Sequence, residues 1–286
     1  MITYGLVNSV VLALIALGFS ITFGISRVAN FAYGGIYILS GVIGWFFLVK
    51  LGFPYPLAAT VSVASAGLLG ALIYRFLLQR LRGLELSEVI STFALGLIIL
   101  ETLRTMGVMG FDYRLPPFSR GSVEILGTYV SVQRLVIIAS GAILLILLHL
   151  FVHNTKIGLA FRGVAQDDHT AFTVGINPDK ISMLSLALGS MVCSVAALLI
   201  LPLGTISVDA GYDILLKALA VCIVGGLEST TGIVLASFII GYTEVFTAMY
   251  ISSSLTIVVP LFCMLAILLV RPSGLFGKHK ELEERI

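Results

Sequence analysis

Charged residues are scarce in this chain. They make up 11% of its 286 residues, whereas hydrophobic residues make up 58%, and the mean hydropathy is +1.09. A soluble domain of this size cannot bury so much apolar surface, but a lipid bilayer solvates it. A soluble fold is therefore excluded. The formal net charge of +2 is also too small for the dense positive surface by which proteins bind nucleic acid.

Cysteine is equally scarce. Cys193, Cys222 and Cys263 stand singly in apolar runs, without the close spacing of a zinc site. A disulfide framework and a metal site are both disfavoured, because isolated cysteines in such runs behave as small core residues.

Sequence motifs of enzymes are missing as well. The segment that ends at Gly277-Lys278 has Pro272 where the phosphate-binding loop needs its first glycine, so ATP binding by that motif is excluded. His149 and His153 lie one helical turn apart but have no carboxylate within that turn. Asp213 and Glu228 are expected at opposite membrane faces, which excludes a shared-proton protease pair. We therefore expect no catalytic residue, no cofactor and no resident metal.

What the chain does contain is a series of apolar stretches long enough to cross about 30 Å of hydrocarbon. Eight of them are clear, at residues 5–25, 31–49, 56–76, 89–106, 135–152, 181–201, 233–248 and 255–270. The first lacks the positive flank of a cleaved signal peptide and is interpreted as a span. A further run, 215–226, is short and ends at Gly225-Gly226, so it is either a ninth span or a re-entrant half-helix. The prediction is an all-α polytopic membrane protein with eight or nine transmembrane helices, forming one domain over residues 1–286.

Basic residues near the span ends predict the orientation. They gather in the loop around residues 75–82, in the segment 154–180 and in the tail 271–286, which we place in the cytoplasm, with the amino terminus outside. The loop 107–133 must then lie outside although it contains Arg114 and Arg120.

The segment 154–180 is the longest polar interval in the chain. Apolar residues recur at helical spacing in its first half: Ile157, Phe161, Val164 and Ala165. This spacing predicts a short amphipathic helix. Asp167 is a candidate cap for a second short helix, and Gly175 can end it in a left-handed conformation. Asn177-Pro178 then predicts the start of the next span. The segment is therefore expected to be a folded cytoplasmic loop and not a flexible linker.

Few charged residues lie inside the spans. Glu101 and Arg104 are three residues apart on one helix face and can pair locally. Lys217 and Glu244 can pair across helices, because an unpaired charge at that depth is costly. None of these resembles a relay of carboxylates, which disfavours a proton-driven pump.

Three segments together carry a resemblance to a known family. They are residues 17–41, around Phe-Gly-Ile-Ser-Arg-Val-Ala-Asn-Phe-Ala-Tyr-Gly-Gly; residues 158–176, around Gly-Leu-Ala-Phe-Arg-Gly-Val-Ala-Gln-Asp; and residues 217–232, around Gly-Gly-Leu-Glu-Ser-Thr-Thr-Gly. The chain resembles the membrane permeases of branched-chain amino acid ABC importers. It departs from the family pattern at Tyr33, Gly163 and Glu228, where members often have His, Ala and Gly.

The resemblance implies a transport subunit that translocates branched-chain or related amino acids. Partners implied in the same way are cytoplasmic ATPases, a second and usually different permease chain, and an external substrate-binding protein, all at the cytoplasmic membrane of a prokaryote. The loop 154–180 would dock on the ATPase. The residues assigned to that docking are Ile157, Gly158, Phe161, Arg162, Asp167, Asp168, Phe172 and Gly175. Ile157, Phe161 and Phe172 are expected to form its apolar contact, and Arg162, Asp167 and Asp168 to orient it through charge.

Some alternatives stay open. Relatives of this family are associated with urea, amides and small carboxylates, so the sequence does not fix the substrate, and a stand-alone channel or secondary transporter is a second class. A channel predicts function from this chain alone, whereas an importer predicts an ATPase partner. Asn30 and Ser40, polar residues near helix breaks, are candidates for the translocation path. The segments 112–120 and 209–213 are candidates for contact with the external binding protein.

Overall fold

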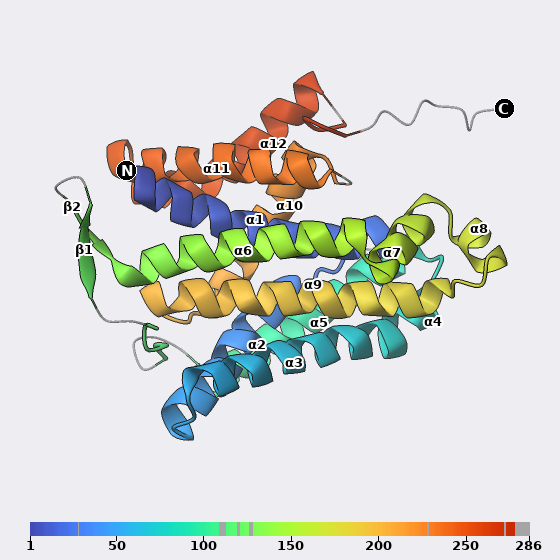
Figure 1. Cartoon of the computed structure of the whole chain (residues 1–286), viewed down its shortest axis with the longest axis horizontal. Coiled ribbons are helices and arrows are strands. Elements are labelled where there is room, and N and C mark those ends of the chain that lie inside the picture. Colours follow the sequence, from blue (N-terminus) through green and yellow to red (C-terminus); the bar gives the residue numbers. More distant parts are fainter. Residues whose placement is uncertain are drawn as a thin grey trace.

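The computed structural model describes residues 1–27, 29–108, 113–118, 121–125, 128–227, 229–271 and 273–277. Within these ranges the chain forms a bundle of long helices, with a small β-hairpin at one end and two short helices, α7 and α8, at the other (Figure 1). Residues 278–286 of the predicted tail, together with Asp112, Arg120 and Glu228, lie outside the described residues.

Eight helices of the described part are long and apolar enough to cross a membrane, which confirms the eight predicted spans. They are α1 (Ile2–Ser26), α2 (Tyr33–Trp45) with the π-helical turn Phe46–Lys50, α3 (Tyr55–Ile73) continued by the π-helical turn Tyr74–Leu78 and α4 (Gln79–Leu81), α5 (Glu85–Thr105), α6 (Val132–Asn154), α9 (Pro178–Ile200) with the 3-10 turn Leu201–Leu203, α11 (Thr230–Tyr250), and the 3-10 turn Ser253–Ile257 with α12 (Val258–Val270). In lipid, helices satisfy their backbone polar groups internally, which is why these apolar runs fold in this way.

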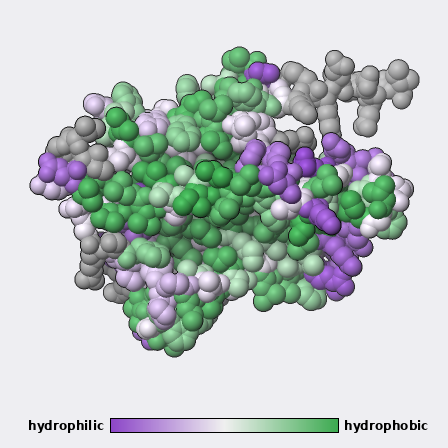
Figure 2. All heavy atoms as spheres, viewed as in Figure 1, coloured by the Kyte–Doolittle hydropathy of each residue, from purple (hydrophilic) through white to green (hydrophobic). Residues whose placement is uncertain are grey.

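Helix α1 forms the centre of the bundle. It packs against α6, α9, α10 and α11, and its residues Leu14, Ile15 and Ala16 are fully buried. By contrast, nearly all apolar side chains of α6 and α12 are at least partly exposed. Figure 2 shows apolar side chains over the middle of the molecule, with hydrophilic ones gathered towards its two ends. This distribution fits a bundle surrounded by hydrocarbon.

The short run near residues 215–226 forms helix α10 (Ala210–Gly225), which begins before the predicted stretch and has 16 residues. It crosses α2 closely, since a Cβ atom added at Gly34 would lie 2.1 Å from the carbonyl oxygen of Gly211. At its other end Gly226 turns the chain with φ +97, a conformation that glycine reaches without strain. The last turn of α10 is stabilised by hydrogen bonds from the backbone of Leu275 and Phe276 to the carbonyls of residues 224 and 225. Both interpretations of this run, a ninth span and a re-entrant half-helix, stay predictions.

The loop 107–133 contains an antiparallel hairpin that the sequence analysis did not predict. Strand β1 (Ser122–Ile125) pairs with β2 (Thr128–Ser131), with Ser122 opposite Ser131. The hairpin lies at the end of the bundle opposite α7 (Lys156–Gln166) and α8 (Asp168–Thr173), near the start of α1 (Figure 1). The amino terminus and the loop 154–180 are thus at opposite ends, as the predicted orientation requires.

Candidate functional site

Helix α7 begins directly after the span α6. Thr155 caps it, because its hydroxyl accepts a hydrogen bond from the backbone N–H of Gly158 at 3.0 Å. Gly158 has no room for a side chain, since an added Cβ would lie 2.4 Å from the carbonyl oxygens of Phe151 and Val152. This close approach folds α7 sharply back on the end of α6.

One face of α7 packs on the bundle. Phe161 is 1% exposed and meets the ring of Phe151 edge to face, with 6.1 Å between ring centroids, and Val164 is also buried. Phe161 therefore anchors α7 on the bundle instead of contributing to an exposed apolar surface. Ile157 and Phe172, the other two residues of the expected apolar contact with the ATPase, are accessible, because they are 44% and 65% exposed.

The predicted caps of the second short helix are confirmed. The Asp167 carboxylate accepts hydrogen bonds from the backbone N–H groups of His169 and Thr170, at 2.9 and 3.2 Å, and from the Thr170 hydroxyl at 2.8 Å. These bonds, that from the hydroxyl first, lower the pKa of Asp167 below its usual value. Gly175 ends the segment with φ +86, and the Asn177 side chain caps α9 by accepting from the Lys180 N–H at 3.2 Å.

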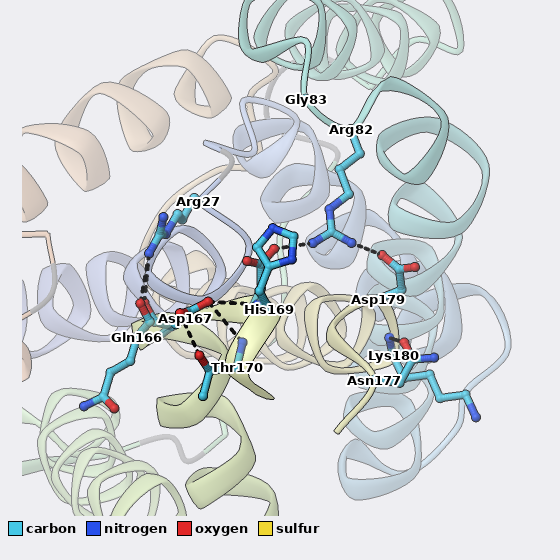
Figure 3. A network of polar contacts seen from close by, with 12 residues as sticks. Arg27, Arg82, Gly83, Gln166, Asp167, His169, Thr170, Asn177, Asp179 and Lys180 are labelled. Atoms are coloured by element: carbon cyan, nitrogen blue, oxygen red, sulfur yellow. Dashed lines mark hydrogen bonds and ion pairs between the residues drawn. The ribbon is translucent and has the colours of Figure 1, made fainter. Parts of the chain in front are cut away.

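Two arginines from distant segments hold this loop on the bundle (Figure 3). Arg82 forms ion pairs with Asp168, at 2.7 Å, and with Asp179 at the start of α9. Arg27 donates to the carbonyl oxygens of Ala165 and Gln166 at 3.4 and 3.3 Å, where the carboxyl end of α7 attracts positive charge. Arg27 adopts φ 55, an unusual conformation for a residue with a side chain.

Neither arginine was assigned to the docking loop from the sequence. Arg82 belongs to the basic loop around residues 75–82 that predicts the orientation, and Arg27 belongs to the first segment of the family resemblance. Their positive charge is complementary to the acidic residues of the loop, which suggests that some arginine pairs with them. The sequence does not show which arginine lies near which acidic residue. Arg162, which was assigned, is exposed and donates to the carbonyl oxygen of His153 at 3.2 Å.

A cavity of about 210 Å³ separates the loop from the bundle. Its walls include Arg27, Arg82, Glu88, Val164 and Asp168. Helix α7 is packed on the bundle through the buried Phe161 and Val164, whereas α8 is held by the ion pair of Asp168 with Arg82, with a hollow beneath part of the loop. Ion pairs of this exposure contribute little stability. Helix α8 is therefore held less tightly than α7.

The two candidate path residues are buried inside the bundle. Asn30 is 1% exposed, and its side-chain oxygen accepts from the Ala32 N–H at 3.1 Å. Ser40 is also 1% exposed and donates to the carbonyl oxygen of Ile36 at 2.7 Å. The first bond stabilises the helix break before α2, and the second lies within α2. The hydroxyl of Ser62 on α3 donates to the backbone carbonyl oxygen of Ser40 at 2.7 Å and so connects the two helices. A role in translocation stays a prediction.

The predicted pairs of charged residues inside the spans are confirmed. Lys217 Nζ lies 3.0 Å from a carboxylate oxygen of Glu244, which joins α10 to α11. Arg104 lies 3.6 Å from Glu101 and also pairs with Asp209 at 2.7 Å. Among the described residues, no group of three or more His, Cys, Asp and Glu side chains is arranged to hold a metal ion.

Comparisons with known proteins agree with this architecture. Residues 1–268 match the family model described as "Branched-chain amino acid transport system / permease component". The chain is 26% identical over 282 residues to the high-affinity branched-chain amino acid transport system permease protein LivH of Salmonella typhimurium, with 93% of this chain and 91% of LivH covered. It is 28% identical over 283 residues to the permease protein BraD of Pseudomonas aeruginosa, with the same shares covered.

A further relative and a solved structure extend the comparison. The chain is 28% identical over 291 residues to a probable branched-chain amino acid transport permease protein LivH of Methanocaldococcus jannaschii, with 95% and 90% of the two chains covered. A chain of PsaBC from Streptococcus pneumoniae shares the fold, with a TM-score of 0.54, 15% identity, and 96% and 92% of the two chains covered. Because the family model spans nearly the whole sequence and the fold agrees with it, this chain belongs to the permease-component family of branched-chain amino acid transport systems.

Proposed function

We propose that this chain is the membrane-spanning permease subunit of an ATP-driven importer of branched-chain or related amino acids. The observation that carries the proposal is family membership over residues 1–268, together with a folded loop that presents apolar side chains at the end of the bundle. The chain contains no phosphate-binding loop, so the ATP hydrolysis of such a system resides on separate subunits.

The α7–α8 segment is the proposed docking surface for those ATPases. Its exposed apolar side chains are Ile157, Leu159, Phe172 and Val174. The charged residues Lys156 and Arg162 are also exposed. Exposed apolar side chains accompanied by charged ones are typical of a protein interface.

The connections of this segment explain how docking would move the transmembrane helices. Helix α7 follows α6 after the single residue Thr155, and α8 is joined to α9 by residues 174–177. Asp168 and Asp179 are bridged by Arg82 from the end of α4, so the loop is also connected to the third span. A pull by the ATPases on α7–α8 therefore reaches α6, α9 and the α3–α4 span, while the cavity beneath the loop gives room for the shift.

The remaining partners belong to the opposite end of the bundle or to its side. An external binding protein would meet the end that contains the hairpin, including residues 113–118 and 209–213, while a second permease chain would complete the membrane unit. The site of action proposed here is the cytoplasmic membrane of a prokaryote. The relatives named above occur in bacteria and in Methanocaldococcus jannaschii.

Copurification tests the proposal. The chain is expressed in its own organism with a tag, extracted in mild detergent, and the associated proteins are identified by mass spectrometry and tested for ATP hydrolysis. We expect a stoichiometric ATPase and a second permease chain. A chain that purifies alone and carries amino acids in liposomes without ATP would establish a channel or secondary transporter instead.

A further inference from the structure

A second cavity lies at the hairpin end of the bundle and has no part in the docking loop. Its volume is about 290 Å³, close to the lower limit for small-molecule sites. The walls come from the first turns of α1, the start of α6, the end of α9 with the 3-10 turn after it, the middle of α10, the second half of α11 and the 3-10 turn before α12. Segments from across the whole chain therefore meet here.

A buried carboxylate, that of Glu244, lines this cavity and is paired with Lys217. Glu244 is 3% exposed, and one of its oxygens, Oε2, accepts hydrogen bonds from Asn8 at 2.8 Å and from Lys217 at 3.2 Å. The other oxygen, Oε1, lies 3.0 Å from Lys217 Nζ but accepts no hydrogen bond of good geometry from the described residues. One acceptor on a nearly fully buried carboxylate therefore still lacks a well-placed donor.

A buried ion pair of this kind contributes little net stability to a fold. Taking two charges out of water costs several kcal/mol per ion, and apolar replacements of similar volume often stabilise a protein. Within a membrane, ionisable residues that face a cavity mark binding sites or pathways far more often than they serve packing. We therefore interpret the Lys217–Glu244 pair as part of a ligand-binding site.

The composition of the walls indicates the chemistry of that ligand. Arg134 lines the same cavity and lies over the ring of Tyr4 at 3.8 Å, so two cations face one carboxylate. The excess positive charge suits an anionic group, and the underused oxygen of Glu244 suits a cationic donor. The remaining wall is apolar and includes Val7, Ile200 and Leu203.

We infer that this cavity binds a small zwitterion with an apolar side chain, an α-amino acid, in the outward half of the permease. Lys217 and Arg134 receive the carboxylate, Glu244 receives the ammonium group, and the apolar wall contacts the side chain. The Lys217–Glu244 contact holds the site together while it is empty. The identification of the ligand as transported substrate rests on the function proposed above, whereas the binding chemistry rests on these residues alone.

Site-directed thiol labelling measures occupancy directly. Ala248 is exposed and lines the cavity, so Ala248→Cys reports access to it. Cys263 is partly exposed and is replaced by alanine, whereas Cys193 and Cys222 are buried. The full chain, with the subunits that copurify with it, is placed in lipid nanodiscs and labelled with a charged methanethiosulfonate reagent. Leucine is compared with leucinamide, which lacks the carboxylate, and with 4-methylpentanoate, which lacks the ammonium group.

Leucine at about ten times its dissociation constant is expected to slow labelling about tenfold, because the labelling rate follows the empty fraction. The two analogues should protect far less. Arg134→Gln should raise the leucine concentration needed for half protection about tenfold, the ratio expected for loss of one charged contact. Arg104→Gln is the matched control and should leave protection unchanged, since Arg104 pairs with Glu101 and Asp209 away from this cavity.

Equal labelling with and without leucine, or equal protection by leucine and leucinamide, would overturn the inference. Arg134 takes no part in the Lys217–Glu244 pair, so its variant tests the site without removing that pair. The assay uses no ATP. Amino acid uptake without protection would reject this site and retain the importer, whereas protection without ATP-driven uptake would retain the site and reject the importer.

Discussion

Phe172 provides the sharpest test of the proposed docking surface. It lies on α8, and its side chain is 65% exposed although it is large and apolar. Replacing it by alanine removes the ring and keeps a good helix former in a short helix. The fold of the loop should therefore survive, because the Asp167 cap and the buried Ala171 are untouched.

The size of the effect follows from the exposed part of the ring. Full burial of a phenylalanine side chain stabilises by about 1.5–3 kcal/mol. Because 65% of Phe172 is available to a partner, docking would gain about 1–2 kcal/mol from this residue. Since 1.4 kcal/mol corresponds to a factor of ten, Phe172→Ala should weaken the affinity for the ATPase by about 5–30-fold.

The assay is a titration of the purified ATPase onto the chain in nanodiscs, with binding followed by fluorescence anisotropy. Phe262→Ala is the matched control, because Phe262 is 69% exposed on α12, away from the α7–α8 loop. We expect the control to bind as the unmodified chain does. Equal affinities for Phe172→Ala and Phe262→Ala would refute the assignment of α8 to the ATPase contact.

Four further outcomes follow from the same geometry. Gly158→Ala should destabilise the chain by about 1–3 kcal/mol through overpacking. Gly163 has open space around it, so Gly163→Ala should stabilise the chain by up to about 1 kcal/mol. Thermal unfolding in detergent compares the two variants. Asn177→Ala should cost about 1 kcal/mol by removing a helix cap, measured in the same way. The lowered pKa of Asp167 means that its carboxylate stabilises α8 above the pKa of the unfolded chain and that this contribution disappears as the pH falls through the lower, folded pKa; protease cleavage of the loop should rise there, and less so in Asp167→Asn. Arg82→Gln should speed hydrogen exchange in α8 and make that exchange insensitive to salt, and unchanged exchange would contradict the role of its ion pairs.

Local chemistry explains what the sequence predicted well. The eight spans follow from the length of apolar runs, and the caps at Asp167 and Asn177 follow from side chains that bond to backbone N–H groups within three residues. The end of the segment at Gly175 follows from the left-handed conformation that glycine adopts without strain. The Lys217–Glu244 pair is a contact between distant residues, yet it too was predicted. Burying either charge alone in the membrane would be costly, and few candidate partners exist in the spans.

Contacts between distant residues explain what the sequence did not predict. Phe161 has helical spacing with both the exposed Ile157 and the buried Val164, and its burial is decided by the packing of α7 against Phe151. The Arg82–Asp168 contact joins residues 86 positions apart, which no local pattern encodes. The hairpin at 122–131 falls in a segment whose alternating residues are too few to distinguish a strand from a loop.

We propose that this permease moves amino acids only when ATPases act on the α7–α8 loop. The most direct measurement is uptake of radiolabelled leucine into proteoliposomes that contain the chain with its copurifying subunits and binding protein, with ATP enclosed or absent. We expect uptake that requires ATP and that falls in Phe172→Ala but not in Phe262→Ala. Leucine uptake at the same rate without ATP, or uptake unaffected by changes in the loop, would contradict it.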